Sequence, residues 1–256
     1  MLGFSAAMEP HDFQFFNSLH STGLRSAKCI ALFIFDHSPA VHNPAKLTKT
    51  LARALHDSDY AELRLDFLNP KQIPSCLNTV KKHLKRCICT LRSSSEGGRF
   101  RGSEKERISI LKLIAEFNPH LLDVEYKTIK KNKRLYWYLK STKANLLVSW
   151  HDFSRTPNDK TISAMARKMS KLSNHIKIVT TAKTINDTMR VLALYYKVPK
   201  GTDMVAFAMG DYGRMSRILC TKLGSPYTYV SLGKPIAPGQ FSLYEMKAIF
   251  KLQKLD

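Results

Sequence analysis

The chain has 256 residues and a mass of 29.1 kDa, enough to bury a sizeable core in a single large domain. With 44% hydrophobic residues and 11 each of glycine and proline, its composition excludes a disordered or fibrous protein, and no apolar stretch approaches the roughly 18 to 20 residues of a membrane-spanning helix. The 41 lysines and arginines outnumber the 20 acidic residues, and the formal charge of +21 attracts anions, whether nucleic acid or a small anionic substrate.

The distribution of this charge favours the small anion. The lysines are scattered over stretches typical of solvated helix faces, and no nucleic-acid-binding motif accompanies them. A basic protein that binds nucleic acid or another polyanion is the alternative. Five cysteines without a CxxC spacing predict reduced structural thiols in a cytoplasmic protein. The first 27 residues lack the apolar core of a secretory signal, and we interpret residues 1–28 as an N-terminal extension of unknown role.

From residue 29 onward, short apolar runs alternate with amphipathic stretches of ten or more residues. The apolar runs predict eight strands, at residues 29–35, 60–67, 86–92, 120–126, 145–150, 175–180, 203–209 and 227–232. The gaps predict helices, such as residues 43–56 with a proline in the first turn and residues 103–117 behind a Ser-x-x-Glu capping box. Eight strand–helix units predict a closed (β/α)8 TIM barrel, so that residues 29–256 form one α/β domain.

A barrel of this kind carries its chemistry at the carboxyl ends of its strands. Glu62, Arg64 and Asp66 alternate along the second predicted strand, so their side chains are expected on one face. If that face is the barrel interior, the charges must pair and bind something, because an unpaired buried ion costs several kcal/mol. An edge strand with a solvated face is the alternative.

Other polar residues follow the strands at the same end. Arg92 stands at the tip of the third strand, where a planar guanidinium suits a carboxylate, and Glu96 follows in a Ser/Gly-rich loop. A plain surface loop is the alternative. Arg217 follows the seventh strand and would supply a second contact to an anion. Gln240 comes after a Pro-Gly pair in a loop predicted to cover the mouth, from which it would hydrogen-bond substrate hydroxyls.

Two further residues suggest a reaction. His151 directly follows the fifth predicted strand, and Lys177 lies inside the sixth, between two isoleucines. A lysine on an edge strand or one that snorkels to solvent is the alternative. Inside a barrel, desolvation and the nearby arginine charges would favour a neutral amine that can attack a carbonyl. His151 would be within reach as general acid and base, and Glu96 could orient its imidazole.

Seven motifs, in this order, make the chain similar to the type I 3-dehydroquinate dehydratases, the Schiff-base enzymes of the shikimate pathway: ELRLD, TLRSSSEGG, DVE, SWHDFSRTP, IKIV, AMGDYGRMSR and APGQ. The resemblance implies that Lys177 forms an imine with the ketone of 3-dehydroquinate. It implies that His151 removes the C2 proton and then helps the hydroxyl leave, with Glu96 paired to it. It also implies a set of substrate-binding residues, one arginine taking the carboxylate: Glu62, Arg64, Arg92, Arg217 and Gln240.

The resemblance further implies a homodimer that acts in aromatic amino acid biosynthesis and needs no metal or cofactor. Its chemistry agrees with the residues, because an iminium is an electron sink that makes the adjacent C–H acidic enough for an imidazole to deprotonate. The chain departs from the family at Ile236, where many members carry a hydroxyl residue, and residues 1–28 have no counterpart in it. Another Schiff-base barrel, such as an aldolase, would leave the WHDF and APGQ motifs unexplained.

Overall fold

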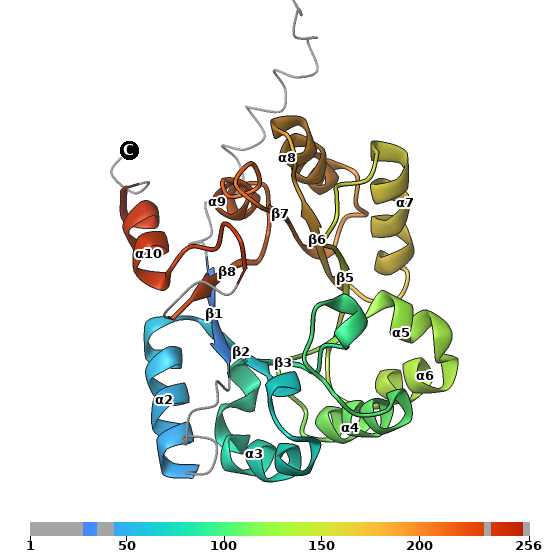
Figure 1. The fold of residues 1–256 in the computed structure, drawn as a ribbon, viewed down its shortest axis with the longest axis vertical. Helices are drawn as coiled ribbons and strands as arrows, with labels where there is room; N and C mark the ends of the chain where they lie inside the picture. The colour runs from blue at the N-terminus through green and yellow to red at the C-terminus, as the bar shows by residue number, and fades with distance from the viewer. Residues whose placement is uncertain (1–27, 35–43, 233–236, 253–256) are drawn as a thin grey trace, which may run out of the picture.

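The structure is a computed structural model that describes residues 28–34, 44–232 and 237–252 (Figure 1). Its sheet contains the strands β1 Lys28–Ile34, β2 Tyr60–Arg64, β3 Cys87–Thr90, β4 Leu121–Glu125, β5 Leu146–Asp152, β6 His175–Thr181, β7 Asp203–Met209 and β8 Tyr227–Ser231. The α-helices are α2 Pro44–Asp57, α3 Ile73–Thr79, α4 Glu104–Glu116, α5 Tyr126–Lys131, α6 Lys133–Ser141, α7 Asp159–Ser170, α8 Ile185–Leu192, α9 Ser216–Lys222 and α10 Leu243–Leu252.

All strand pairs are parallel, and the sheet runs in the order β7-β6-β5-β4-β3-β2-β1-β8. Because β8 pairs with β1, the sheet curls into a nearly closed barrel that the helices surround (Figure 1). Across the described ranges no hydrogen-bonded ladder joins β7 to β8, and α9 packs against both strands at this seam. The predicted (β/α)8 barrel is therefore confirmed.

Strand side chains alternate between two apolar layers. Cys87 and Cys89 of β3 pack in the larger core between the barrel and the helices, whereas Ile88 packs with other strand residues inside the barrel. Along β4 and β5 the inward positions change from apolar to polar toward the carboxyl end, from Leu121 to Asp123 on β4. The interior is thus closed by apolar side chains at one end and lined by polar groups at the other.

Several strand ends differ by one to three residues from their predictions, and the differences at β2 and β5 affect predicted site residues. β2 stops at Arg64, and a 3-10 turn at Leu65–Phe67 follows, so Asp66 is not on the strand as predicted. The turn lets the buried Asp66 carboxylate accept two hydrogen bonds from Arg64, at 2.9 and 2.8 Å, and one from the Arg99 N–H at 3.0 Å. β5 continues to Asp152, because its backbone pairing with β6 extends to that residue. His151 therefore lies within the strand and not after it.

The helix predictions at residues 43–56 and 103–117 correspond to α2 and α4. Ser103 caps α4 by accepting a hydrogen bond from the Glu106 N–H, which is one of the two hydrogen bonds of the predicted capping box. Among the described helices, none is long and apolar enough to cross a membrane. Residues 1–27 of the predicted extension and Ile236 lie outside the described residues; residue 28 belongs to β1.

Candidate active site

Lys177 points into the barrel from β6 and is only 5% exposed. Its Nζ donates to Asp123 Oδ2 at 2.9 Å and to the Tyr229 hydroxyl at 3.4 Å, and lies 3.6 Å from Glu62 Oε1. The strand that carries Lys177, β6, lies between β5 and β7. The strand that carries Glu62, β2, lies between β1 and β3, so neither β6 nor β2 is an edge strand. The edge-strand interpretations of these two charged strands are therefore wrong.

The charges that contact the amine are carboxylates, whereas the sequence prediction considered only arginines. Glu62 also accepts a hydrogen bond from the Thr90 hydroxyl at 2.7 Å, which holds the carboxylate in place. Asp123 is the central residue that sequence reasoning missed. It could have been found from the sequence, because it is a charged residue inside an apolar predicted strand, as Lys177 is.

Arg92 follows β3 and extends this network across the barrel. It donates to Asp123 Oδ2 and to the Ser149 hydroxyl, both at 2.6 Å, and lies 3.6 Å from Glu125 Oε1. Burial alone would raise the pKa of Asp123, but the charges of Arg92 and Lys177 hold this pKa below its usual range. Asp123 is therefore an ionised bridge between the arginine and the lysine.

The network continues outward to the helix layer. Arg107 of α4, only 1% exposed, donates to Glu125 Oε2 at 2.8 Å and to Glu104 at 2.8 and 2.9 Å. A buried ion is tolerated when charges and hydrogen bonds satisfy it on each side. Alternating charges from α4 to β6 thus allow an ammonium group to lie in the interior.

The second part of the site is a pair formed by His151 and Glu96. His151 Nδ1 lies 3.3 Å from Glu96 Oε2, and the imidazole, 10% exposed, stacks on Phe153 with 5.9 Å between ring centroids. Glu96 ends a 3-10 turn at Ser94–Glu96 and is 2% exposed. Gly97 follows at φ +75°, where an added Cβ would lie 2.6 Å from the Phe153 ring. Only glycine suits this close approach.

Burial changes the protonation of both members of the pair. It raises the pKa of Glu96 to about 7, despite the opposing charge of Arg92. It lowers the pKa of His151 well below the usual value, and the positive charges of Arg92 and Lys177 act in the same direction. Near neutral pH the imidazole is therefore unprotonated and able to accept a proton, while Glu96 exchanges between its neutral and ionised forms.

This pairing leads to a pH prediction. As the pH rises through about 7, Glu96 ionises, and its negative charge can then stabilise the imidazolium that His151 becomes after accepting a proton. We expect kcat/KM to rise with pH over this range, and Glu96→Gln to abolish the rise and lower kcat about tenfold. A pH series of initial rates measures this. The exposed Glu106→Gln is the control, and an unchanged rise in Glu96→Gln would contradict the prediction.

The remaining predicted residues lie around this centre. Arg64 is held by Asp66, and its guanidinium lies 5.1 Å from the Phe67 ring centroid. Arg217, the second residue of α9, is 2% exposed, and its guanidinium lies 4.2 Å from the centre of the Phe207 ring. Its Nη2 donates to the Pro238 carbonyl at 3.5 Å, which brings α9 beside the segment that carries the buried Gln240.

Arg217 differs from the other buried arginines in its partners. Within the described part of the chain no carboxylate pairs with it, and its Nε has no hydrogen-bond partner. Burial lowers its pKa to about 10. A buried guanidinium with an unsatisfied donor is a suitable contact for an anionic ligand.

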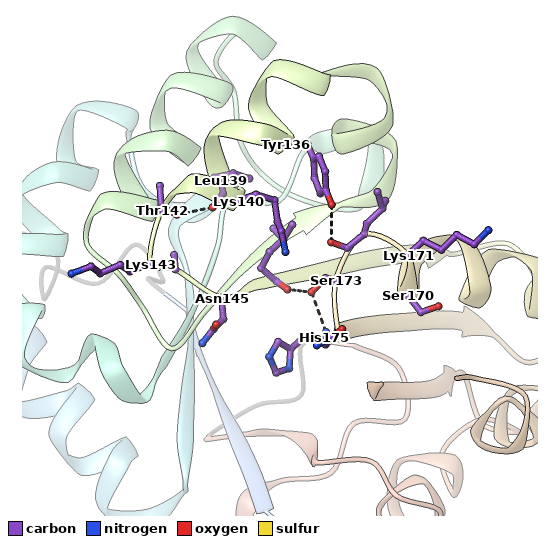
Figure 2. A pocket seen from close by; sticks show the side chains of 14 residues that line it. Tyr136, Leu139, Lys140, Thr142, Lys143, Asn145, Ser170, Lys171, Ser173 and His175 are labelled. Atoms are coloured by element: carbon purple, nitrogen blue, oxygen red, sulfur yellow. Dashed lines mark hydrogen bonds between the residues drawn. The ribbon is translucent and has the colours of Figure 1, made fainter. Parts of the chain in front are cut away.

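A separate pocket of about 320 Å³ lies at the opposite end of the barrel, where β5 and β6 begin (Figure 2). Its basic residues are Lys140, Lys143, Lys171 and His175. In Figure 2 the Lys143 and Lys171 side chains extend away from the pocket, and hydroxyls such as that of Tyr136 are bonded to backbone carbonyls. The pocket contains none of the predicted site residues.

Comparison with known proteins identifies the family. The sequence model described as type I 3-dehydroquinase matches residues 40–256. The chain belongs to the type I 3-dehydroquinase family. It is 38% identical over 198 residues to a 3-dehydroquinate dehydratase of Dehalococcoides mccartyi, covering 75% of this chain and 85% of that protein. It is 31% identical over 214 residues to the 3-dehydroquinate dehydratase of Methanocaldococcus jannaschii, covering 82% and 94%.

Solved structures of dehydroquinases have the same fold. The 3-dehydroquinate dehydratase of Geobacillus kaustophilus superposes with a TM-score of 0.78 at 19% identity, covering 90% of this chain and 91% of that one. The Aquifex aeolicus enzyme gives 0.71 at 27% identity, covering 88% and 98%. The family resemblance found in the motifs is thus confirmed, and nothing in these dehydroquinase matches supports the nucleic-acid alternative.

Proposed function

We propose that the protein is a 3-dehydroquinate dehydratase, a hydro-lyase that converts 3-dehydroquinate to 3-dehydroshikimate and water through an imine on Lys177. The observation that carries this proposal is the buried Lys177 amine, with the His151–Glu96 pair at the carboxyl end of the adjacent strand. A buried amine beside a neutral imidazole is the minimal set for imine-assisted removal of a proton next to a carbonyl.

In the proposed reaction the unprotonated Lys177 amine attacks the substrate ketone, and loss of water gives an iminium. The cationic C=N bond withdraws electrons from C2, and the His151 nitrogen that does not face Glu96 takes the C2 proton. The resulting imidazolium returns a proton to the departing hydroxyl, so a second water is released and the ring gains a C=C bond. Hydrolysis of the conjugated iminium consumes one water and regenerates the amine.

Substrate binding is assigned to the charges around this centre. Arg217 is the better candidate for the substrate carboxylate, because Arg92 already donates to Asp123 and Ser149. The rest of the proposed substrate-binding set consists of Glu62, Arg64, Arg92 and Gln240. The arginines of this set can bind a carboxylate, and its glutamate and glutamine can hydrogen-bond hydroxyls, so the set suits a polyhydroxylated carboxylate.

The conjugated enone of the product absorbs in the ultraviolet, and the substrate does not contain it. We expect absorbance to appear when purified protein is mixed with 3-dehydroquinate, without added metal or cofactor. A protein that is folded by circular dichroism but produces no enone would contradict the proposal. The prediction that no cofactor is needed is tested by repeating the assay after treatment with a chelator.

We also propose a homodimer, as the family resemblance implies. Its support is an apolar surface on α8, α9 and the loop before α9, which contact one another; the exposed side chains are Ile185, Met189, Tyr212, Met215 and Leu219. Several large apolar side chains exposed on neighbouring elements are typical of an interface. Sedimentation should give twice the 29.1 kDa chain mass, and a monomer at assay concentration would contradict the dimer.

A cytoplasmic location remains our proposal for the protein. It is supported by the five cysteines, all of which are buried and unpaired, as expected in a reducing compartment. The nucleic-acid alternative has no such support.

A further inference from the structure

Tyr229 of β8 is a phenol in contact with the reacting amine, and no step derived above uses it. The Lys177 Nζ lies 3.4 Å from the Tyr229 hydroxyl and 4.6 Å from the centre of its ring. The tyrosine is 5% exposed and packs against Phe207, with 6.2 Å between ring centroids. Its hydroxyl is therefore fixed beside the nitrogen and protected from bulk solvent.

His151 does not have the same contact. In the β5–β6 register Lys177 is opposite Ser149, whereas His151 is opposite Val179, two residues closer to the carboxyl end. The contacts recorded for the imidazole in the described ranges are with Glu96 and Phe153, and none joins it to the amine. The imidazole is thus placed for a substrate atom farther from the nitrogen. The phenol is placed for the oxygen on the carbon that bonds to the nitrogen.

The phenol has the protonation state that a donor needs. Burial raises the pKa of Tyr229 well above its usual value, so the hydroxyl keeps its proton at neutral pH. A hydroxyl can accept a hydrogen bond from the ammonium group in the resting enzyme and donate one after the amine has reacted. The two carboxylates beside the amine, Asp123 and Glu62, cannot donate while they are ionised.

We propose that Tyr229 is a catalytic residue of the imine-forming half-reaction, donating its hydroxyl proton to the carbinolamine oxygen that leaves as water. This inference rests on the proposed function and adds to it by assigning two proton transfers to two different residues. Tyr229 acts at the oxygen bonded to the imine carbon, and His151 acts at C2.

The protons and bonds balance in three steps. The Lys177 ammonium first releases one proton to solvent, the amine forms the N–C bond to the ketone carbon, and a proton moves from nitrogen to oxygen to give a neutral carbinolamine. Tyr229 then transfers its proton to the carbinolamine hydroxyl, the C–O bond breaks, water leaves, and the nitrogen lone pair closes the C=N⁺ bond. The proton released at the start returns to the phenolate, and the reverse sequence hydrolyses the product iminium.

The test is the rate of adduct formation in Tyr229→Phe, which keeps the ring and removes only the hydroxyl. Protein and 3-dehydroquinate are mixed rapidly and quenched with borohydride at increasing times, and intact-mass spectrometry measures the reduced Lys177 adduct. We expect this rate to fall about a hundredfold. The isotope effect of C2-deuterated substrate on kcat should fall to about 1, because imine formation becomes the slow step.

Tyr136→Phe is the matched control. Tyr136 is a half-buried tyrosine of α6 at the opposite end of the barrel, where its hydroxyl donates to the Leu172 carbonyl at 3.2 Å. We expect its adduct rate to stay near that of the wild type. A wild-type adduct rate in Tyr229→Phe overturns the inference alone, and so does an equal loss in both variants. A wild-type protein that forms no Lys177 adduct overturns the proposed function as well.

Discussion

Lys177→Ala is expected to abolish turnover, with kcat at least about 10⁴-fold below the wild type. Without the amine no iminium can form, so the C2 proton is no longer acidic enough for an imidazole to remove. Asp123 would keep its contacts with Arg92 and Ser149, so the carboxylate is not left unpaired and the fold should persist. The enone assay measures the loss, and mass spectrometry after borohydride treatment should find no adduct.

Two controls accompany this variant. Lys177→Met keeps much of the side-chain volume and should be as inactive as the alanine variant, which separates the loss of the amine from the loss of packing. Lys183→Ala removes an exposed lysine just beyond the end of β6 and should keep full activity. An adduct at a lysine other than Lys177, or full turnover in Lys177→Ala, would contradict the imine mechanism.

His151→Ala is expected to lower kcat by about 10³- to 10⁴-fold while the imine still forms. The amine and its contacts with Asp123, Glu62 and Tyr229 are untouched, so the substrate can be captured but its C2 proton has no base. The adduct should therefore accumulate, and borohydride should trap a larger fraction of the protein as the unreacted substrate imine than it does in the wild type.

His175→Ala is the matched control for this variant. His175 begins β6 at the opposite end of the barrel, where its Nδ1 lies 3.2 Å from Asp203 Oδ2, and it lines the pocket of Figure 2. Its removal should leave turnover near the wild-type value. If His151→Ala turned over normally, or if it trapped no imine, the division of roles between histidine and lysine would be wrong.

Much of the architecture could be predicted because it depends on local patterns. Continuous apolar runs separated by amphipathic stretches indicate buried parallel strands and covering helices, and their number predicts the barrel. A lysine between two isoleucines and a histidine at the end of a buried run stand out for the same reason, since neither fits the apolar surroundings. The motifs around them were sufficient to identify the family.

The errors lie where a side chain depends on partners far away in the sequence. Asp66 alternates with Arg64 and was expected on the strand, but its hydrogen bonds with Arg64 and the Arg99 backbone accompany a 3-10 turn. The ion pairs of Arg92 with Asp123 and Glu125 were not predicted, because both acids lie on another strand, β4. The ion pairs that form between charged side chains depend on how the strands are aligned across the barrel.

The sequence by itself determined the type and order of the elements, the polar residues at strand ends and the family. Only the tertiary structure decided the environment of those residues. Lys177 and Tyr229 are 52 positions apart, and their contact exists because the sheet curls until β8 pairs with β1. Likewise, the pKa of Glu96 rises to about 7 because the fold removes water from its carboxyl group. Burial and long-range electrostatics are properties of the assembled barrel, and no local stretch of sequence contains them.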